Sequence, residues 1–368
     1  MSDAMEVSAR AGRLRQALTA DESAPDALLI TSLTNLRYLT GFTGSAGMLF
    51  VLPEEAVLLT DGRYATQASE QLAATGVDAR VEVAKGPDQP ERAGQIVASS
   101  PVARLGLEAA HVSWARQRSM AADWFPDLDL VPTVGLVEAL REIKDAGELA
   151  RLADAARIAD AALEQVRPQL AAGLTEAAFG RALDFEMRRL GASGPSFETI
   201  VASGPNAAMP HHRPGARLIQ PGEPVVLDFG ARVDGYCSDM TRTVWVGALA
   251  DAELRRAVGV VLASQAAGVA AVGPGVACAE VDKVCREVIA EAGWGDLFVH
   301  GTGHGVGLDI HEAPAVAATS TDTLEVGQVV TVEPGVYLPG LGGVRIEDTV
   351  VVTDDGCRRL TSTPKDSP

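Results

Sequence analysis

Short apolar runs alternate with amphipathic stretches over the first 140 residues of the chain. The apolar runs are residues 27–30 (ALLI), 47–52 (GMLFVL) and 56–60 (AVLLT). Runs of this length are typical of buried strands. Residues 64–75 have the pattern of a helix, so the sequence predicts an α/β domain over residues 1–140. The segment 34–47 (TNLRYLTGFTGSAG) is rich in glycine, and we expect a loop over a strand edge there. Residues 61–64 (DGRY) are either a turn that opens a helix or a functional loop.

A second pattern begins near Lys144-Asp145 and occurs twice. The segments of the first copy are a helix over 145–168, a helix capped by Thr175 and carrying Phe179, Leu183, Met187 and Leu190 on one face, and a hairpin over 224–246. The segments of the second copy are a helix over 251–271, a helix containing Cys278 and Cys285, and a hairpin over 327–352. The copies are offset by about 100 residues. The pattern predicts a pseudo-symmetric α+β domain over residues 141–368, with both hairpins in one sheet and a site between them.

The first hairpin carries two acidic residues on apolar strands. Asp234-Gly235 is a strong two-residue turn signal. With that turn, Asp228 lies opposite Thr241, and Asp239 is its diagonal neighbour on the same face. Diagonal neighbours are about 7–8 Å apart, so the two carboxylates can converge.

The second hairpin repeats this arrangement with Glu333 and Glu347, placed almost symmetrically about the loop 339–343 (PGLGG) on strands that are otherwise apolar. Any one of these acids alone is more simply an exposed residue or an arginine partner. Four together could not all stay ionised without compensation. We therefore expect bound metal, in the form of two ions.

Histidines gather in the stretch 300–314 (HGTGHGVGLDIHEAP). His300, His304 and His311 lie among glycines that disfavour a helix, so we expect a loop or strand whose backbone lies close to a ligand. His211 and His212 lie in a loop rich in proline and glycine. Carboxylates with one imidazole favour Mn²⁺, Co²⁺, Fe²⁺ or Zn²⁺. A pair of such ions suits hydrolysis of an amide-like bond.

Composition narrows the class of protein. The formal net charge of −18 argues against a nucleic-acid binder that depends on phosphate contacts. No apolar run reaches the roughly 18–20 residues of a membrane span, and the first residues lack the apolar segment of a signal peptide; they are expected to form a short surface helix. The four cysteines form no C-x-x-C pair. We expect reduced thiols in a cytoplasmic protein, with Cys278 and Cys285 in the core.

Several of these stretches resemble one known family. DFG (228–230) with Asp239, HGTGHGVGLDIHE, EPGVY (333–337) and VRIED (344–348) resemble the M24 metallopeptidases of the pita-bread fold. The likeness is greatest to the Xaa-Pro peptidases, aminopeptidase P and prolidase. Residues 35–47 and 59–64 (LTDGRY) are similar to the creatinase-type N-terminal domain of those enzymes. Methionine aminopeptidases share only the catalytic half.

The resemblance implies a role for each matching residue. The implied ligands of two divalent metal ions are Asp228, Asp239, His304, Glu333 and Glu347. Asp239 and Glu347 would be shared by both ions, and Glu333 would also accept the proton of the attacking water. A hydroxide bridging the ions would attack the carbonyl before proline, with Mn²⁺ the first choice of metal and Co²⁺, Zn²⁺ and Fe²⁺ the alternatives.

The resemblance also assigns the residues around the substrate. His211 and His311 would contact the substrate or the tetrahedral intermediate, a role that His212 fits less well. His300 would line the proline pocket. Arg345 would support the site or reach the carboxyl side of the substrate, and Tyr337 would lie near the metals. The implied partners are a proline-containing peptide and a second copy of the chain in a homodimer.

Alternatives remain at this point. The choice between aminopeptidase P and prolidase is open, although the short chain leans towards the bacterial prolidase-like group. A metal-dependent amide hydrolase of another small molecule, as in creatinase and ectoine-derivative hydrolases, would share the fold. A pita-bread binding module without metal is expected to have lost ligands, and here all five are present.

Overall fold

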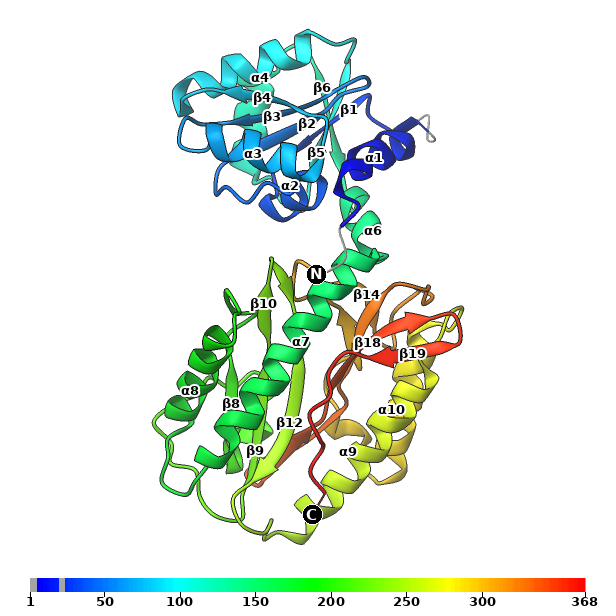
Figure 1. Ribbon diagram of the computed structural model, residues 1–368. Helices are drawn as coiled ribbons and strands as arrows, with labels where there is room; N and C mark the ends of the chain where they lie inside the picture. Colours follow the sequence, from blue (N-terminus) through cyan, green and yellow to red (C-terminus); the bar gives the residue numbers. More distant parts are fainter. Residues whose placement is uncertain (1–4, 20–23, 368) are drawn as a thin grey trace. The chain divides into compact units, whose positions relative to one another are not determined.

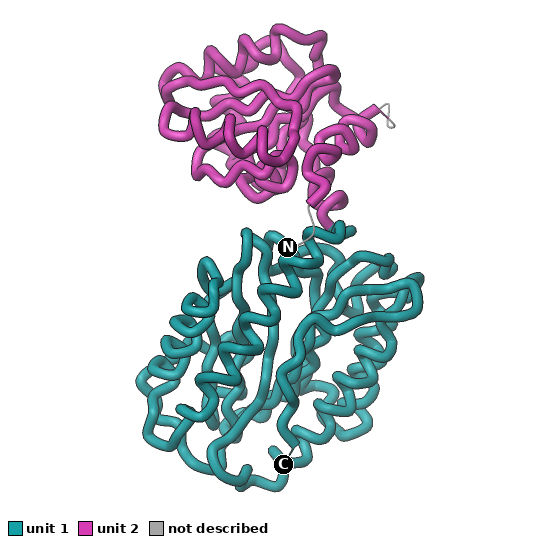
Figure 2. The backbone as a smooth tube through the Cα atoms, viewed as in Figure 1, with its two compact units in different colours: residues 1–4, 142–368 teal, residues 5–141 magenta. Residues whose placement is uncertain are grey.

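The computed structural model describes residues 5–19 and 24–367. The chain forms two compact units, shown in different colours in Figure 2. The N-terminal unit is Met5–Arg141, and the C-terminal unit begins at Glu142. Each unit is described by itself.

The N-terminal unit is built on a six-stranded sheet with the order β4-β3-β2-β1-β5-β6. Its strands are β1 (Ala27–Ile30), β2 (Met48–Val51), β3 (Ala56–Thr60), β4 (Arg80–Val83), β5 (Arg104–Glu108) and β6 (Asp129–Thr133). The α-helices that accompany them are α1 (Arg10–Thr19), α2 (Leu33–Thr40), α3 (Ala65–Thr75), α4 (Gln89–Ala98), α5 (Trp114–Ser119) and α6 (Leu136–Glu142). β1 pairs antiparallel with β2 and parallel with β5, so the sheet is mixed. The three apolar runs and the helix over 64–75 predicted from the sequence are confirmed.

The expected loop over residues 34–47 is wrong in its first half, which is the helix α2. Ser32 caps this helix by accepting a hydrogen bond from the Asn35 backbone N–H, and Gly41 ends it in the left-handed region at φ 77°. Leu36 and Leu39 are buried on one face. The glycines that suggested a loop begin only where the helix ends. Residues 61–64 form the turn that opens α3, since Tyr64 is its N-cap residue.

The C-terminal unit contains the predicted repeat of two helices and a hairpin. Its helices are α7 (Ala146–Val166), α8 (Glu176–Arg189), α9 (Ala252–Ala271) and α10 (Cys278–Glu291). The strands of its first half are β7 (Gly194–Pro195), β8 (Ile200–Ser203), β9 (Pro224–Phe229), β10 (Ala231–Val233), β11 (Tyr236–Cys237) and β12 (Met240–Trp245). The strands of its second half are β13 (Gly303–Gly305), β14 (Glu312–Val316), β15 (Val329–Val332), β16 (Gly335–Leu338), β17 (Gly342–Arg345), β18 (Asp348–Thr353) and β19 (Gly356–Arg359). Figure 1 shows α7 and α8 beside the strands of the first half and α9 and α10 beside those of the second.

Local signals explain where the first two helices of this unit begin. Asp145 and Glu148 form a reciprocal capping box at the start of α7. The Thr175 side chain accepts a hydrogen bond from the Ala178 backbone N–H and caps α8, as predicted. Each repeat buries its own apolar cluster: Phe179, Leu183 and Met187 lie in the first. Cys278 and Cys285 lie in the second, which confirms their expected place in the core.

The two hairpins do not form one hydrogen-bonded sheet, and that expectation is corrected here. The first half has the strand order β12-β9-β8, and the second has the order β14-β13-β15-β18-β19. They meet instead along a seam between β12 and residues 345–349. Three of the hydrogen bonds across the seam are Thr349 Oγ1 to the Asp239 carbonyl (2.7 Å), the Glu347 N–H to the Thr241 carbonyl (3.1 Å) and Thr243 Oγ1 to the Arg345 carbonyl (2.8 Å). Threonine side chains make two of these three contacts, so the seam has regular register without a full backbone ladder.

Among residues 5–19 and 24–367, no helix is long and apolar enough to cross a membrane.

We expect Leu183→Ala to lower the free energy of unfolding by about 2–5 kcal/mol, because it opens a cavity in the cluster beneath the first hairpin. Chemical denaturation measures this loss. Phe185→Ala on the same helix is the control: its side chain is 67% exposed, so the change should stay within about 0.5 kcal/mol. Equal losses in the two variants would contradict the assigned face of α8.

Candidate metal centre

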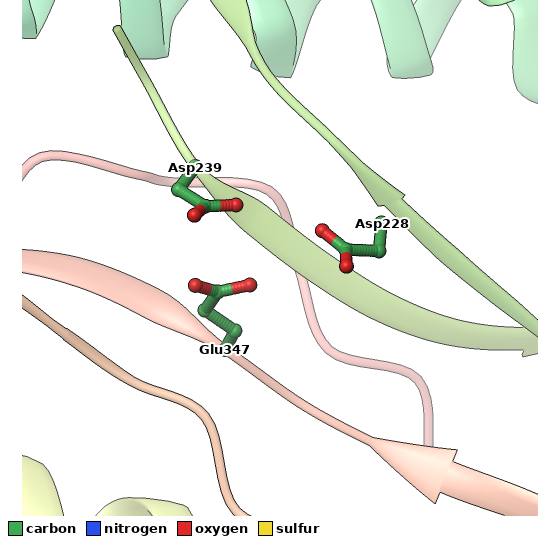
Figure 3. Close-up of side chains that lie close together, drawn as sticks. All are labelled: Asp228, Asp239 and Glu347. Carbon is green, nitrogen blue, oxygen red and sulfur yellow. The ribbon is translucent and has the colours of Figure 1, made fainter. Parts of the chain in front are cut away.

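Three carboxylates converge at the seam between the two halves of the C-terminal unit. Asp228 lies on β9, while Asp239 and Glu347 directly precede β12 and β18. One oxygen from each lies within 4.8 Å of the others, and Figure 3 shows the three groups pointing toward one another. Asp228 is opposite Thr241, the register that the Asp-Gly turn predicted.

Asp239 and Glu347 are buried, Asp228 is half-buried, and the cluster is incompletely hydrogen-bonded. Burial, reinforced by Glu347 and Asp228, raises the pKa of Asp239 well above its usual range. Burial, reinforced by the charges of Glu333 and Asp228, likewise raises the pKa of Glu347 well above its usual range. Among the described residues, Asp228 Oδ1 and Glu347 Oε1 have no hydrogen-bond partner. Buried acceptors without a donor are costly, and a divalent cation would satisfy them.

Glu333 and His304 complete the cluster. Glu333 lies between β15 and β16, just outside the strands where we expected it, and Thr331 Oγ1 donates to its Oε1 at 3.1 Å. His304 Nε2 lies 3.3 Å from Glu333 Oε1 and 3.5 Å from Asp239 Oδ2. Although burial opposes ionisation of Glu333, the His304 contact and charge lower its pKa to about 2.

The His304 ring is oriented by the backbone of the next residue. Its Nδ1 lies 3.0 Å from the Gly305 carbonyl oxygen, which can only accept a hydrogen bond. Nδ1 therefore carries a proton, and in the neutral ring Nε2 keeps the free lone pair that faces the carboxylates. This is how metal-binding histidines are commonly held.

The glycines around His304 serve strand packing, and two of them, Gly301 and Gly303, also line the cavity described below. The expectation that the backbone of this stretch lies close to a ligand therefore stays a prediction. A Cβ on Gly303 would lie 2.0 Å from the Thr331 carbonyl oxygen, and one on Gly305 would lie 2.2 Å from the Ala313 carbonyl oxygen. The neighbouring backbone thus comes closer to β13 than any side chain allows. That closeness brings His304 to Glu333.

Arg345 and Thr241 support the acids from below. Arg345 donates to Asp228 Oδ2 at 2.6 Å, to the Tyr337 hydroxyl at 2.9 Å and to Thr241 Oγ1 at 3.1 Å. Thr241 Oγ1 in turn donates to Glu347 Oε2 at 2.8 Å. The buried guanidinium is therefore largely occupied by the protein itself.

A cavity of about 400 Å³ opens over the cluster. His211 and His311 line it, and the rings of His311 and His304 lie 4.3 Å apart, edge to face. His300 also lines it, with its Nε2 2.7 Å from the Tyr337 hydroxyl. Burial lowers the pKa of His300, which favours the neutral ring.

The adjacent histidines 211 and 212 differ in their surroundings. His211 is exposed. His212 Nε2 lies 2.9 Å from Glu176 Oε2 at the start of α8, and Glu176 also accepts hydrogen bonds from Ser203 and Asn206. Both histidines line the cavity, but Glu176 holds His212 in place and so anchors the loop.

The structure brings all the sequence-predicted site residues to one place, and it adds others. Thr241 and Glu176 were not predicted as site residues. Thr241 could have been found as the cross-strand partner of Asp228; Glu176 reads in the sequence only as an acid in the first turn of a helix. The cavity lining also includes Phe197, Glu198, Ile200, Arg213 and Ile310, which no sequence pattern singled out.

The cluster consists of four acids and one imidazole, and two of its buried carboxyl oxygens lack a hydrogen-bond donor within the described part of the chain. Such a set of donor atoms fits a divalent metal. Comparison with known families agrees. Residues 150–354 match the model of metallopeptidase family M24, and residues 10–143 match the creatinase/prolidase N-terminal domain. The fold and the site together define a metallopeptidase. The chain belongs to family M24, with the two-domain, pita-bread architecture expected from the sequence.

Relatives cover nearly the whole chain. An uncharacterized peptidase of Bacillus subtilis, YqhT, is 43% identical over 341 residues, which are 93% of this chain and 95% of the relative. The solved Xaa-Pro dipeptidase from Bacillus anthracis is 40% identical with a TM-score of 0.93, covering 98% of this chain and 99% of that one. The X-Pro aminopeptidase from Thermotoga maritima is 34% identical with a TM-score of 0.88, covering 97% and 99%.

The pKa shifts predict how the metal-free protein responds to pH. Asp239 and Glu347 keep their protons in the folded chain at a pH where the unfolded chain has released them, so stability falls as pH rises. His304, whose pKa is also raised, has the same sign above 6.5. Three groups act oppositely: Glu333 only below about pH 4.5, and His300 and His311, whose pKa values burial lowers, below about pH 6.5. The thermal midpoint of EDTA-treated protein should therefore fall between about pH 6.5 and pH 8, and divalent metal should restore it.

The matched control for this prediction is the double variant Asp239→Asn/Glu347→Gln. It removes the two titrating groups, so its thermal midpoint should depend less on pH and should not rise with metal. A midpoint of the parent chain that rises across this range would contradict the assigned direction.

Proposed function

We propose that this metallopeptidase hydrolyses the peptide bond before proline, using two divalent metal ions held by Asp228, Asp239, His304, Glu333 and Glu347. The observation that carries the proposal is the convergence of these five donors at the floor of one cavity. Similarity to proteins named Xaa-Pro dipeptidase and X-Pro aminopeptidase supports the substrate class.

The donor set favours Mn²⁺, with Co²⁺, Zn²⁺ and Fe²⁺ as alternatives, because it is rich in oxygen and contains one imidazole. Two divalent ions carry four positive charges, which balance the charge of four ionised carboxylates, so two ions are proposed rather than one. When bound, the metal pair supplies an activated water and a Lewis acid for the scissile carbonyl.

Glu333 is the proposed proton carrier. Its low pKa keeps it ionised in the metal-free site, and its position between β15 and β16 faces the cavity. It accepts the proton of the attacking water and returns it to the departing proline nitrogen. That nitrogen carries no N–H in the substrate, so the protein must recognise it by shape.

Histidines that line the cavity are proposed to stabilise the transition state and to shape the proline pocket. His211 and His311 are proposed to donate hydrogen bonds to the oxygen that becomes negative in the transition state. His300, held by Tyr337, is proposed as a wall of the proline pocket. Arg345 is proposed to orient Asp228 rather than to bind substrate, since its donors are already engaged.

Two broader features belong to the same proposal. All four cysteines lie in the described residues and are free, which supports a reducing, cytoplasmic setting. The homodimer implied by the family resemblance is proposed as well, and sedimentation velocity tests it.

The substrate proposal predicts cleavage of Ala-Pro or Ala-Pro-Ala by the Mn²⁺-loaded protein, and none after EDTA treatment. Release of free alanine, followed by chromatography, measures both reactions. Preference for Ala-Pro would make the enzyme a dipeptidase, and preference for Ala-Pro-Ala an aminopeptidase. Ala-Ala is the control for specificity. Cleavage of neither proline peptide with metal bound would overturn the proposal.

The histidine assignment predicts different results for adjacent residues. His211→Ala should lower kcat by roughly 10²-fold, as expected for loss of one oxyanion donor, with thermal midpoint and metal content unchanged. His212→Ala should lower the thermal midpoint, because it removes a partner of the buried Glu176. Steady-state kinetics, thermal unfolding and metal analysis separate the two. A His211→Ala variant with parental kcat would remove that residue from the mechanism.

A further inference from the structure

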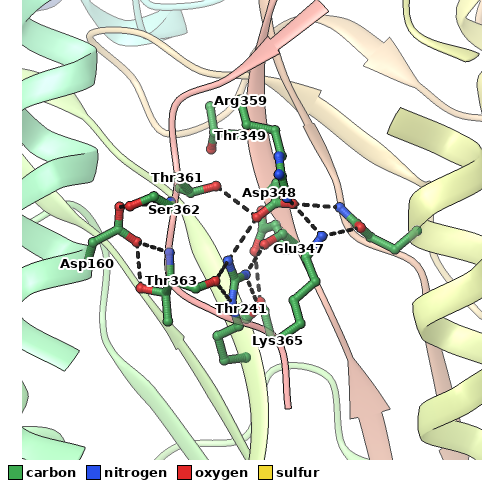
Figure 4. A network of polar contacts seen from close by, with 12 residues as sticks. Asp160, Thr241, Glu347, Asp348, Thr349, Arg359, Thr361, Ser362, Thr363 and Lys365 are labelled. Atoms are coloured by element: carbon green, nitrogen blue, oxygen red, sulfur yellow. Dashed lines mark hydrogen bonds and ion pairs between the residues drawn. The ribbon is translucent and has the colours of Figure 1, made fainter. Parts of the chain in front are cut away.

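A second polar cluster lies behind the metal centre, on the opposite face of the seam. Successive side chains of a strand point to opposite faces. Thr241 reaches Glu347 on the side of the cavity, so Arg242 and Asp348, the next residue on each strand, face away from it. Figure 4 shows the network around Asp348, with Glu347 beside it.

Arg242 joins the two halves of the unit directly. It lies on β12 in the first half and donates to the carbonyl oxygens of Thr241 (2.9 Å) and Glu347. It also donates to Asp348 Oδ1 at 2.9 Å. Both side chains of this ion pair are almost fully buried. The Arg242 guanidinium therefore holds the backbone of one proposed metal ligand, Glu347, against β12. That strand begins directly after a second proposed ligand, Asp239.

Asp348 gathers further donors from two segments. Gln265 on α9 donates at 3.2 Å, and Thr361 Oγ1 donates at 3.0 Å. Lys365 Nζ lies 2.6 Å from Asp348 Oδ2 and also donates to Gln265 Oε1 at 2.6 Å. A fully buried carboxylate thus links β18 to α9 and to the segment after β19.

That segment, residues 361–366, is here named the strap. Figure 1 shows it between α7 and α9. On the side of α7, Asp160 accepts hydrogen bonds from the backbone N–H groups of Ser362 (2.8 Å) and Thr363 (2.7 Å). The Thr363 carbonyl accepts two hydrogen bonds from Arg242, at 2.7 and 3.0 Å. The strap is therefore bonded to both repeats: to the first through Asp160 and Arg242, and to the second through Asp348 and Gln265.

We propose that the strap sets the spacing of the two repeats at the metal centre, and that Lys365, Arg242 and Asp348 are positioning residues for Glu347. The inference rests on the metal centre of the proposed function, and it does not depend on the substrate.

The charges on the site side explain why such a device is needed. Asp228 and Asp239 belong to the first repeat, and Glu333 and Glu347 belong to the second. Burying four carboxyl groups side by side is unfavourable whether they stay ionised or take up protons, so the metal-free site opposes the approach of the two repeats. The strap and Arg242 hold the repeats together from the other face. A weaker strap lowers the fraction of molecules whose ligands are in place, and metal affinity falls by that fraction.

The test is Lys365→Met in the full chain, with Mn²⁺ affinity measured by titration calorimetry on metal-free protein. We expect the dissociation constant to rise about tenfold, the lower range for a residue that orients a metal ligand. Lys365→Arg keeps the cation and should lie closer to the parent. Arg359→Met is the matched control: Arg359 Nη1 is 3.6 Å from the same carboxylate but exposed and outside the strap, so its dissociation constant should match the parent.

The thermal midpoint of the metal-free variants distinguishes positioning from general destabilisation. A Lys365→Met protein with a lower midpoint but the parent's dissociation constant would overturn the proposal. If that variant does not fold, Asp160→Asn decides, since it weakens the other anchor of the strap: weaker Mn²⁺ binding supports the proposal, and unchanged binding overturns it.

The outcomes also separate this inference from the proposed function. Weaker Mn²⁺ binding in a chain whose parent cleaves no proline peptide would retain the strap and reject the substrate. A parent chain that binds no Mn²⁺ would overturn the metal centre and the strap together.

Discussion

Acidic groups buried together at one seam are the constraint on which the C-terminal unit depends. Asp228, Asp239 and Glu347 place oxygens within 4.8 Å of one another, and two oxygens of these carboxyl groups, Asp228 Oδ1 and Glu347 Oε1, lack a donor among the described residues. Such a cluster is unfavourable by itself. The protein accepts it because Arg345, Thr241 and His304 supply nearby donors and because a bound cation would complete the balance. Without a bound cation, the site therefore keeps buried acceptor oxygens that no donor in the described part of the chain satisfies.

The repeat explains how one chain brings these acids together. Each copy covers a hairpin with two helices, and each contributes two of the four carboxylates. Threonines along the seam replace most of the backbone ladder that would otherwise join the hairpins. The acids consequently lie at an internal boundary between two separately packed cores, where neither core alone would have to bury all of them.

Local signals accounted for much of this arrangement, and contacts distant in sequence account for the rest. The Asp-Gly turn predicted the pairing of Asp228 with Thr241, and helical spacing predicted the buried face of α8. The helix α2 was not predicted, because the glycines that follow it suggested a loop over the whole segment. The seam and the pairing of Arg242 with Asp348 could not be predicted, because they join positions more than 100 residues apart. No short-range pattern encodes which strands come to lie side by side.

The strap has a consequence for the order in which the protein is made. Asp160 and Thr363 are separated by 203 residues, so their contact closes a very long loop. During synthesis every proposed metal ligand is translated before the strap, yet the strap joins the repeats that carry them. Under the strap proposal, a nascent chain displays a complete set of ligands without holding them in place. Firm capture of metal would then be delayed until the strap has emerged, which would protect the growing chain from taking up ions in a half-built site.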